Sequence, residues 1–167
     1  MDNLKEQFSK IYDEYIDKIY RFVYVKVSSP EVAQDITSKV FLKSWEAYQK
    51  APQIQNISAF LYQVARNAIT DHYRVAAGTK TVSTENAQLA DTRTNLHEKA
   101  VLSADMEVIK KAILNLKKDY QDILIWHYLE DMSTEQIAQI LNKPPGTVRV
   151  MIHRGLKYLK DELHEEA

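Results

Sequence analysis

The strongest constraint on the fold of this chain is its scarcity of residues that interrupt a helix. Only three glycines and four prolines occur in 167 residues, and the stretches between them are dominated by Ala, Leu, Ile, Lys, Glu and Gln, which favour helices. Along residues 4–27 the apolar residues recur at a spacing of three and four, which places them on one helical face. These two patterns predict an all-α fold.

Breaks in this periodicity divide the first half of the chain into three expected helices. Ser29 before Pro30 is typical of an N-cap followed by proline at the first helical position, so a second helix should begin there. Residues 50–57 predict a loop, and a third helix should run from about Ser58 to about Val75. Together the three helices should form a bundle with an aromatic-rich core. The outer stripe expected on the third helix contains Gln63, Asn67, Thr70 and Arg74, flanked by Tyr62, Arg66 and Tyr73.

A shift in composition separates the two halves. Residues 78–104 are poor in apolar residues, rich in Ser, Thr and Asn, and show no sustained period, so they predict a flexible linker. Helical periodicity resumes at Met106. The sequence therefore predicts two small helical domains, residues 1–77 and 105–167, joined by that linker.

Several classes of protein are disfavoured by what the sequence contains. There is no cysteine, which excludes disulfides and thiolate zinc sites, and the five histidines form no HExxH or similar motif. We therefore expect no catalytic residue, no metal site and no cofactor. The amino terminus lacks the apolar core of a secretory signal, and no apolar run is long enough to span a membrane. We expect a cytoplasmic protein without membrane insertion.

Residues 131–160 are typical of a helix-turn-helix. Ser133 and Gln136 form a capping-box pattern before an apolar run, which predicts a short helix. Asn142 can adopt the left-handed conformation that ends a helix, and Pro144 and Pro145 prevent its continuation. A second helix should then start at Gly146 and Thr147 (residues 146–147).

The expected second helix carries a basic stripe. Arg149, His153 and Lys157 share one arc with Lys160, and Val150 and Arg154 lie beside them. Such a helix fits the major groove of DNA, although a basic stripe is also common on a solvated surface helix. The net charge of only −1 counts mildly against nucleic-acid binding, unless the DNA contacts are local and a larger partner supplies the rest. We expect Arg149, Val150 and His153 to reach bases, Arg154 and Lys157 to meet the backbone, and Thr147 to lie at the same surface.

These blocks resemble sigma-70-type factors, especially the small extracytoplasmic-function group. The pattern SxxQIAxxLxxPxGTVRxxIHRGLKxL is similar to their region 4, and the blocks PEVAQDITSKVFLKSW and SAFLYQVARNAITDHYR are similar to region 2. The resemblance implies promoter recognition and transcription initiation, in a stress or envelope-response regulon. It also implies three partners: core RNA polymerase, through its clamp helices and flap, promoter DNA, and an anti-sigma factor.

The resemblance assigns residues in the first half of the chain. It implies that the clamp-docking residues are Asp35, Ile36, Ser38, Lys39, Phe41 and Leu42. It implies that the residues for the minus-ten element and melting are Tyr62, Gln63, Arg66, Asn67, Thr70, Asp71 and Arg74. Region 4 should engage the minus-thirty-five element and the polymerase flap.

A few positions depart from the family pattern. Lys39 replaces a common acidic residue, Phe60 replaces a frequent tryptophan, and Val150 and Met151 stand where serine and arginine are frequent. The last change removes an expected DNA contact, so the preferred upstream sequence cannot be transferred from relatives. The alternative function is a stand-alone helix-turn-helix regulator that binds its site without polymerase.

Overall fold

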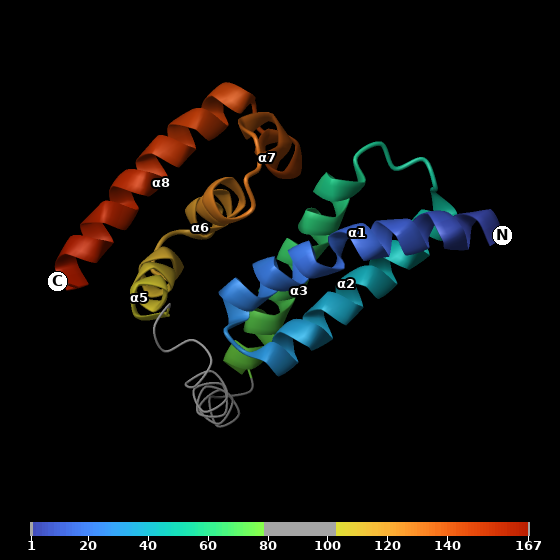
Figure 1. The fold of residues 1–167 in the computed structure, drawn as a ribbon, viewed down its shortest axis with the longest axis horizontal. Coiled ribbons are helices and arrows are strands. Elements are labelled where there is room, and N and C mark those ends of the chain that lie inside the picture. Colours follow the sequence, from blue (N-terminus) through green and yellow to red (C-terminus); the bar gives the residue numbers. More distant parts are fainter. Residues whose placement is uncertain (1, 79–102, 167) are drawn as a thin grey trace. The chain divides into compact units, whose positions relative to one another are not determined.

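The computed structural model describes residues 2–78 and 103–166, and every regular element within these ranges is a helix. The chain divides into two compact units, Met1–Arg93 and Thr94–Ala167, whose helices are labelled in Figure 1. The predicted all-α class is confirmed. Of the predicted linker, residues 79–102 lie outside the described residues, and the domain boundaries stay a prediction.

The first unit is a bundle of three long helices. α1 packs along α2, and α3 packs against both (Figure 1). Ser28 adopts a left-handed conformation, with φ of 61°, where the chain leaves the first helix. The Ser29 hydroxyl then accepts a hydrogen bond from the Val32 amide at 3.3 Å, which confirms the predicted N-cap. The helices are α1 (Asp2–Val27), α2 (Pro30–Lys50) and α3 (Ile57–Gly78).

Helix α3 begins one residue earlier than the sequence predicted. The Asn56 side-chain oxygen accepts a hydrogen bond from the Ala59 amide at 3.0 Å, which satisfies a donor that the first turn leaves open. The helix also continues to Gly78, three residues beyond the predicted end.

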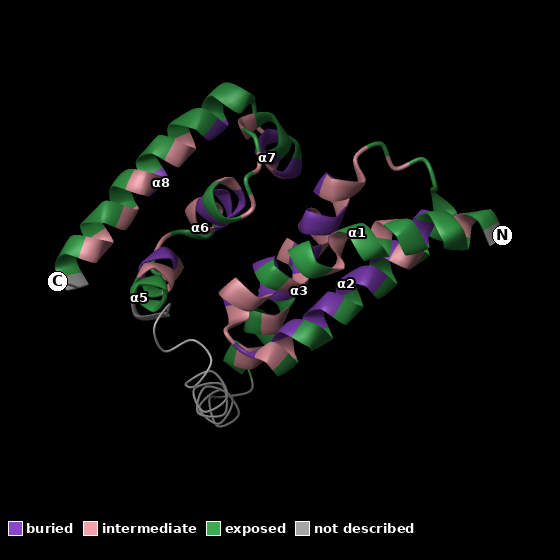
Figure 2. Ribbon diagram, in the orientation of Figure 1, coloured by how far each residue is buried: buried purple, intermediate pink, exposed green. Residues whose placement is uncertain are grey.

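Aromatic rings fill the core of the first unit, as predicted. Phe22 and Tyr62 are fully buried and meet edge to face, with ring centroids 5.6 Å apart. Phe8 lies against both Trp45 and Tyr48, at 5.2 and 5.6 Å between centroids. Figure 2 shows buried residues along the sides on which α1, α2 and α3 meet. Such packing stabilises the relative placement of the three helices.

The second unit is built from shorter helices around a long one. Helix α8 packs against the three shorter α-helices of the unit. The elements are α5 (Ser103–Leu114), α6 (Lys118–Leu124), the π-turn η1 (Ile125–Leu129), α7 (Thr134–Leu141) and α8 (Pro145–Glu166).

The π-turn is a feature that the sequence pattern did not predict. The Glu130 amide bonds to the Ile125 carbonyl five residues back, at 3.2 Å. Residues 122–126 are all buried in succession, ending with the fully buried Trp126. The Met132 amide bonds to the Trp126 carbonyl at 3.0 Å, which directs the chain toward α7.

Gly155 allows α8 to approach α6 closely. A Cβ atom at this position would lie 3.3 Å from the Tyr120 ring and 3.5 Å from the Leu124 Cγ atom. The absence of a side chain at Gly155 therefore permits the close packing of the two helices.

Candidate nucleic-acid interface

The helix-turn-helix is present in the second unit. The Ser133 hydroxyl accepts from the Gln136 amide at 3.1 Å, and the Gln136 side chain accepts from the Ser133 amide at 2.9 Å, so the capping box is complete. Asn142 has φ of 53° and ψ of 46°, the left-handed conformation that ends α7. The next helix begins at Pro145, slightly earlier than predicted, because proline fits the first helical position.

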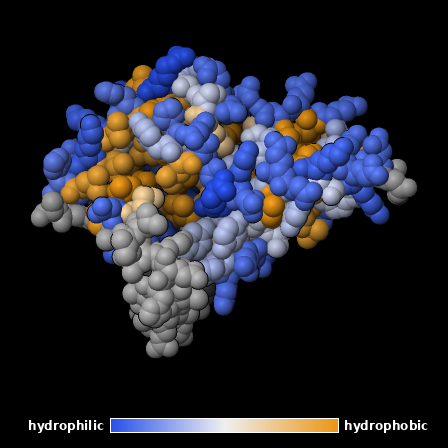
Figure 3. Space-filling view, viewed as in Figure 1, coloured by the Kyte–Doolittle hydropathy of each residue, from blue (hydrophilic) through white to orange (hydrophobic). Residues whose placement is uncertain are grey.

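One arc of α8 is buried and the opposite arc is exposed. Val148 is fully buried against the rest of the unit, and Gly155 is buried as well. In Figure 3 hydrophilic side chains lie along the outer edge of α8. Helix geometry therefore presents the predicted stripe to solvent as one surface, which we call the α8 stripe. Its exposed members are Thr147, Arg149, Val150, His153, Arg154, Lys157 and Lys160.

Arg149 of the α8 stripe has a partner on α7. Its Nη2 atom lies 3.5 Å from the Glu135 Oε1 atom, and both side chains remain more than half exposed. The ion pair therefore restricts the orientations open to the Arg149 guanidinium.

The outer face of α3 is a second polar surface, which we call the α3 face. Asn67, Asp71 and Arg74 are exposed, and the Arg74 guanidinium lies 3.8 Å from the Asp71 carboxylate. The Thr70 hydroxyl donates to the Arg66 carbonyl at 2.9 Å. Gln63, Arg66 and Thr70 are half-buried along the same side of the helix.

Tyr62 requires a correction. The sequence placed this ring beside the polar stripe and the resemblance assigned it to the minus-ten element, but its side chain is fully buried against Phe22. The ring fills the space between α1 and α3, where removing apolar area from water is favourable. Tyr62 is therefore a core residue and does not belong to the exposed α3 face.

Tyr73 also has a structural role that sequence reasoning missed. Its hydroxyl donates a hydrogen bond to the Lys26 carbonyl, one of the carbonyls that the end of α1 leaves without a helical partner. Burial raises the pKa of this hydroxyl above its usual 10.0, so the proton that makes the bond is retained. Tyr73 thus holds α3 against the end of α1.

The exposed side of α2 combines an apolar residue with a polar surround. Leu42 is 59% exposed, and the Lys39 ammonium lies 3.1 Å from the Asp35 carboxylate on the preceding turn. Ser38 is exposed between them. We call these four residues the α2 face.

Two of the residues predicted to dock on polymerase lie in the core instead. Ile36 and Phe41 are only 2% and 5% exposed, and Phe41 meets the Tyr12 ring edge-on at 5.0 Å. The predicted block mixed both sides of an amphipathic helix, so these two residues support the α2 face from below rather than forming it.

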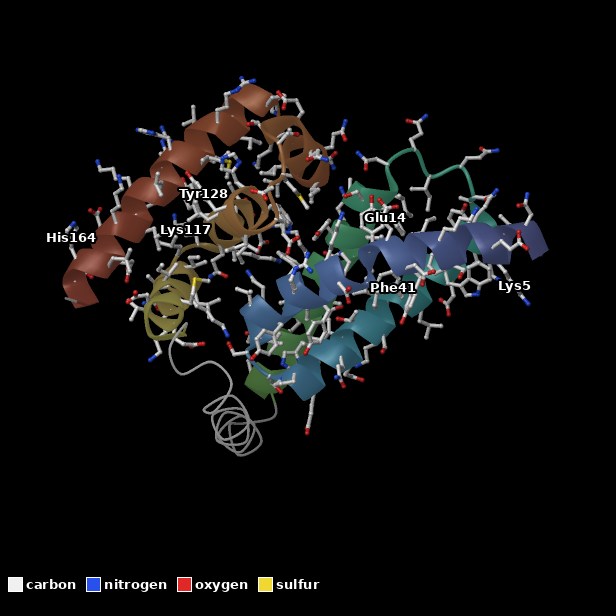
Figure 4. The ribbon with its side chains drawn as sticks, viewed as in Figure 1. Lys5, Glu14, Phe41, Lys117, Tyr128 and His164 are labelled. Atoms are coloured by element: carbon white, nitrogen blue, oxygen red, sulfur yellow. The ribbon has the colours of Figure 1, made fainter. Side chains whose placement is uncertain are left out.

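A shallow apolar groove between α1 and α2 was not predicted. It adjoins Leu42 and continues toward the amino terminus of α1, where Figure 4 labels Lys5 and Phe41 near its two ends. The signal for it was present in the sequence, because residues of α1 at a spacing of three and four share this side. Its lining comprises Lys5, Phe8, Ser9, Tyr12, Phe41, Leu42 and Trp45.

His72 connects the α3 face to the α2 face electrostatically. Burial lowers the pKa of His72 below its usual 6.5, the Lys39 charge lowers that pKa further, and the Asp35 charge opposes both. The imidazole therefore favours its neutral form.

Comparison with known proteins accounts for both units. The sigma-70 region 2 family matches residues 11–79, and the sigma-70 region 4 family matches residues 106–159. The ECF RNA polymerase sigma factor SigW of Bacillus subtilis is 30% identical, and the alignment covers 96% of this chain and 91% of that protein. The chain belongs to the extracytoplasmic-function (ECF) sigma factors. The family predicted from the sequence is confirmed.

Further relatives of this sigma factor agree in sequence and in fold. The ECF sigma factor BldN of Streptomyces coelicolor is 26% identical over 97% of this chain and 62% of that protein. The solved structure of the sigma factor RpoE of Bartonella quintana, in complex with the anti-sigma factor NepR, has a TM-score of 0.67 at 19% identity. It covers 95% of this chain and 98% of that chain, which supports the helical fold.

Family membership fixes the general function of this sigma factor as promoter recognition in transcription initiation. The stand-alone regulator is not favoured, because matches to sigma factors extend across both units. Over residues 2–78 and 103–166, no cluster of three or more His, Asp or Glu residues could hold a metal ion. In the same part of the chain, no helix is apolar enough over a sufficient length to cross a membrane.

Proposed function

We propose that this sigma factor divides its task among three helix faces. The α2 face binds core RNA polymerase at the clamp helices, the α3 face contacts the minus-ten element as it melts, and the α8 stripe reads the minus-thirty-five element. The observation that carries the proposal is the α8 stripe. Its exposed cations lie on the second helix of a helix-turn-helix, whose first helix, α7, is capped at its start and ends in a tight turn.

The amino-terminal part of the α8 stripe is suited to bases and its later part to phosphates. Arg149 can donate two parallel hydrogen bonds to a guanine edge, and His153 lies one turn further along the same arc. Val150, 48% exposed, offers an apolar contact for a thymine methyl group. Thr147, Arg154 and Lys157 are placed to contact the backbone, which positions the helix without reading sequence.

The α3 face is suited to a strand that is already separating. Asn67 and Arg74 offer donors, whereas Asp71 carries a negative charge that keeps Arg74 directed along the helix. Arg66, Gln63 and Thr70 complete the surface from half-buried positions. With Tyr62 in the core, fewer rings are available to stack on unpaired bases.

Energetics imply that polymerase must assist. Opening about ten base pairs costs on the order of 14 kcal/mol, at roughly 1.4 kcal/mol per step. Each base stacked on an aromatic ring returns only about 1–3 kcal/mol. A chain with a net charge of −1 also has little long-range attraction for DNA. We therefore expect weak promoter binding by the free protein and tight binding by the holoenzyme.

The α2 face has the composition of a protein-docking surface. Leu42 provides an exposed apolar centre, and Ser38 with the Asp35–Lys39 ion pair provides a polar rim. Lys39 replaces the acidic residue common in the family, and its pairing with Asp35 limits the positive charge that it adds.

Further partners and the location follow from the same proposal. The second unit would contact the polymerase flap, and an anti-sigma factor would cover the sigma factor when it is inactive, as NepR accompanies the related RpoE. The protein would act in the cytoplasm, where polymerase and promoters meet. Catalysis, a metal and a cofactor have no part in this function.

The experiment is run-off transcription with core polymerase, together with gel shifts with and without that enzyme. We expect Leu42→Asp to abolish polymerase binding while the helical content stays unchanged, because a charge replaces the apolar centre. Val75→Asp is the matched control, since Val75 is 65% exposed on the same unit. Equal promoter affinity with and without polymerase would contradict the proposal.

A further inference from the structure

Glu135 links α7 to the base-reading end of α8. Its Oε1 atom lies 3.5 Å from the Arg149 Nη2 atom, and the two side chains are 63% and 62% exposed. Glu135 stands in the first turn of α7, where a carboxylate is stabilised by the helix amino terminus. The Ser133–Gln136 capping box fixes that turn. The backbone that carries Glu135 is therefore held by α7 and does not depend on Arg149.

The carboxylate restricts the guanidinium that it faces. Arg149 has five N–H donors in a planar fork, and directing one of them at Glu135 leaves others for a base edge. A guanine edge requires two parallel hydrogen bonds from one plane. Because Glu135 reduces the orientations open to that plane, less conformational freedom is lost when the base is bound.

The same carboxylate opposes the main alternative contact of Arg149. A guanidinium at this position could otherwise bind a backbone phosphate on any DNA, which carries no sequence information. A phosphate bound by Arg149 would also lie near the negative charge of Glu135, which repels it. Specificity is the difference between the affinity for the base edge and the affinity for a backbone phosphate. A group that repels the phosphate therefore increases specificity.

We propose that Glu135 is a positioning residue that makes Arg149 discriminate between bases of the upstream promoter element and weakens its non-specific contact with phosphate. This inference rests on the proposed reading of that element by the α8 stripe. Exposed ion pairs are weak, so the expected change in base discrimination is roughly two- to fivefold rather than a complete loss.

The test compares Glu135→Gln with Asp161→Asn in the holoenzyme. Both changes remove one negative charge from the second unit, but Asp161 is exposed beyond the basic part of α8. Initiation is measured on promoters that each carry one changed base in the upstream element, and promoter binding is measured at several salt concentrations. We expect Glu135→Gln to reduce discrimination at one position roughly two- to fivefold and to steepen the salt dependence, since the freed guanidinium gains a phosphate contact.

A double-mutant comparison shows whether Glu135 acts through Arg149. In an Arg149→Ala background, adding Glu135→Gln should change base discrimination no further. Circular dichroism melting checks that each variant folds. The positioning role is overturned if Glu135→Gln leaves discrimination unchanged, if it alters only the salt dependence as Asp161→Asn does, or if its effect persists without Arg149.

The same measurements separate this inference from the proposed function. If Arg149→Ala changes the promoter profile and Glu135→Gln does not, the positioning role alone is wrong. If Arg149→Ala also leaves the profile unchanged, the assignment of the α8 stripe to the upstream element is wrong, and the role of Glu135 is overturned with it.

Discussion

The α3 face and the α8 stripe present polar residues in different ways. On α3, fully buried Tyr62 precedes half-buried Gln63, and Arg66 is half-buried one turn later. On α8, the cations are exposed, and Val148 and Gly155 occupy the buried arc. The proposed DNA contacts and the core packing therefore share neighbouring residues on α3 but are well separated on α8.

This difference suggests that the two surfaces tolerate change unequally. A substitution along α3 readily disturbs the aromatic core of the first unit, whereas outward substitutions on α8 leave its packing arc intact. The following experiments test that contrast, from the largest expected effect to the smallest.

Tyr62→Ala should destabilise the first unit by about 3–5 kcal/mol, because it leaves a cavity where an aromatic ring was fully buried. Tyr62→Phe keeps the ring and should retain the fold. The matched surface change Asn67→Ala should stay within about 0.5 kcal/mol of the unchanged protein. Urea unfolding followed by circular dichroism measures all three. Unchanged stability in Tyr62→Ala would indicate that this ring is exposed on the α3 face and is not part of the core.

Gly155→Val should destabilise the second unit by about 1–3 kcal/mol, because even a Cβ atom there would lie 3.3 Å from the Tyr120 ring. At Gly146 on the same helix an added Cβ atom would meet nothing within 4 Å outside the adjoining helix backbone, so Gly146→Val serves as the control. We expect the control to change stability by no more than about 0.5 kcal/mol. Thermal unfolding compares the pair, and equal effects would show that α8 and α6 are not closely packed.

Ser133→Ala should cost about 1 kcal/mol through loss of the capping box on α7. Ser29→Ala removes the corresponding hydroxyl from α2 in the first unit, where the bond to the Val32 amide measures 3.3 Å. Hydrogen exchange in the first turn of each helix should report the two losses separately. Exchange that speeds up in both helices with either variant would argue against independent units.

Lys157→Ala should weaken holoenzyme binding similarly on all promoter sequences, since a phosphate contact carries no base preference. The slope of log affinity against log salt should become shallower by about 0.9. Binding at several salt concentrations provides the measurement. A change confined to particular promoter sequences would instead place Lys157 among the base-reading residues.

Lys39→Ala should raise the pKa of His72, because the Lys39 charge is one of the causes that lower it. Lys43→Ala is the control on the same helix, and an NMR titration of the imidazole gives both values. Since the pKa of His72 is lowered in the folded chain, the stability that its neutral form contributes above pH 6.5 is lost as the pH falls through the lowered value. An unchanged His72 titration in Lys39→Ala would show that the Lys39 charge on α2 does not act on His72 of α3.

The sequence predicted the helices well because local signals mark their ends. Ser29 with Pro30, the Ser133–Gln136 box and left-handed Asn142 all appear in the structure as expected. The π-turn was missed, since its hydrogen bond from Glu130 to Ile125 leaves no distinct local pattern in the sequence.

The α8 stripe was easier to predict than the faces of the first unit. Outward positions on α8 alternate with a clear packing arc, so periodicity alone separates Arg149 from Val148. On α2 and α3, resemblance to a family assigned whole sequence blocks to a function without showing which side of each helix is exposed. Ile36, Phe41 and Tyr62 were therefore included although they are buried. Tertiary packing decides which side of those helices faces outward.

The unbroken course of α8 from Pro145 to Glu166 has a consequence for how such a protein changes over generations. The exposed residues of α8 can be substituted while the buried residues that pack the helix stay the same. Under the proposed role of the α8 stripe, a duplicated gene could thus acquire a new set of target promoters through a few codon changes, with no need for another fold.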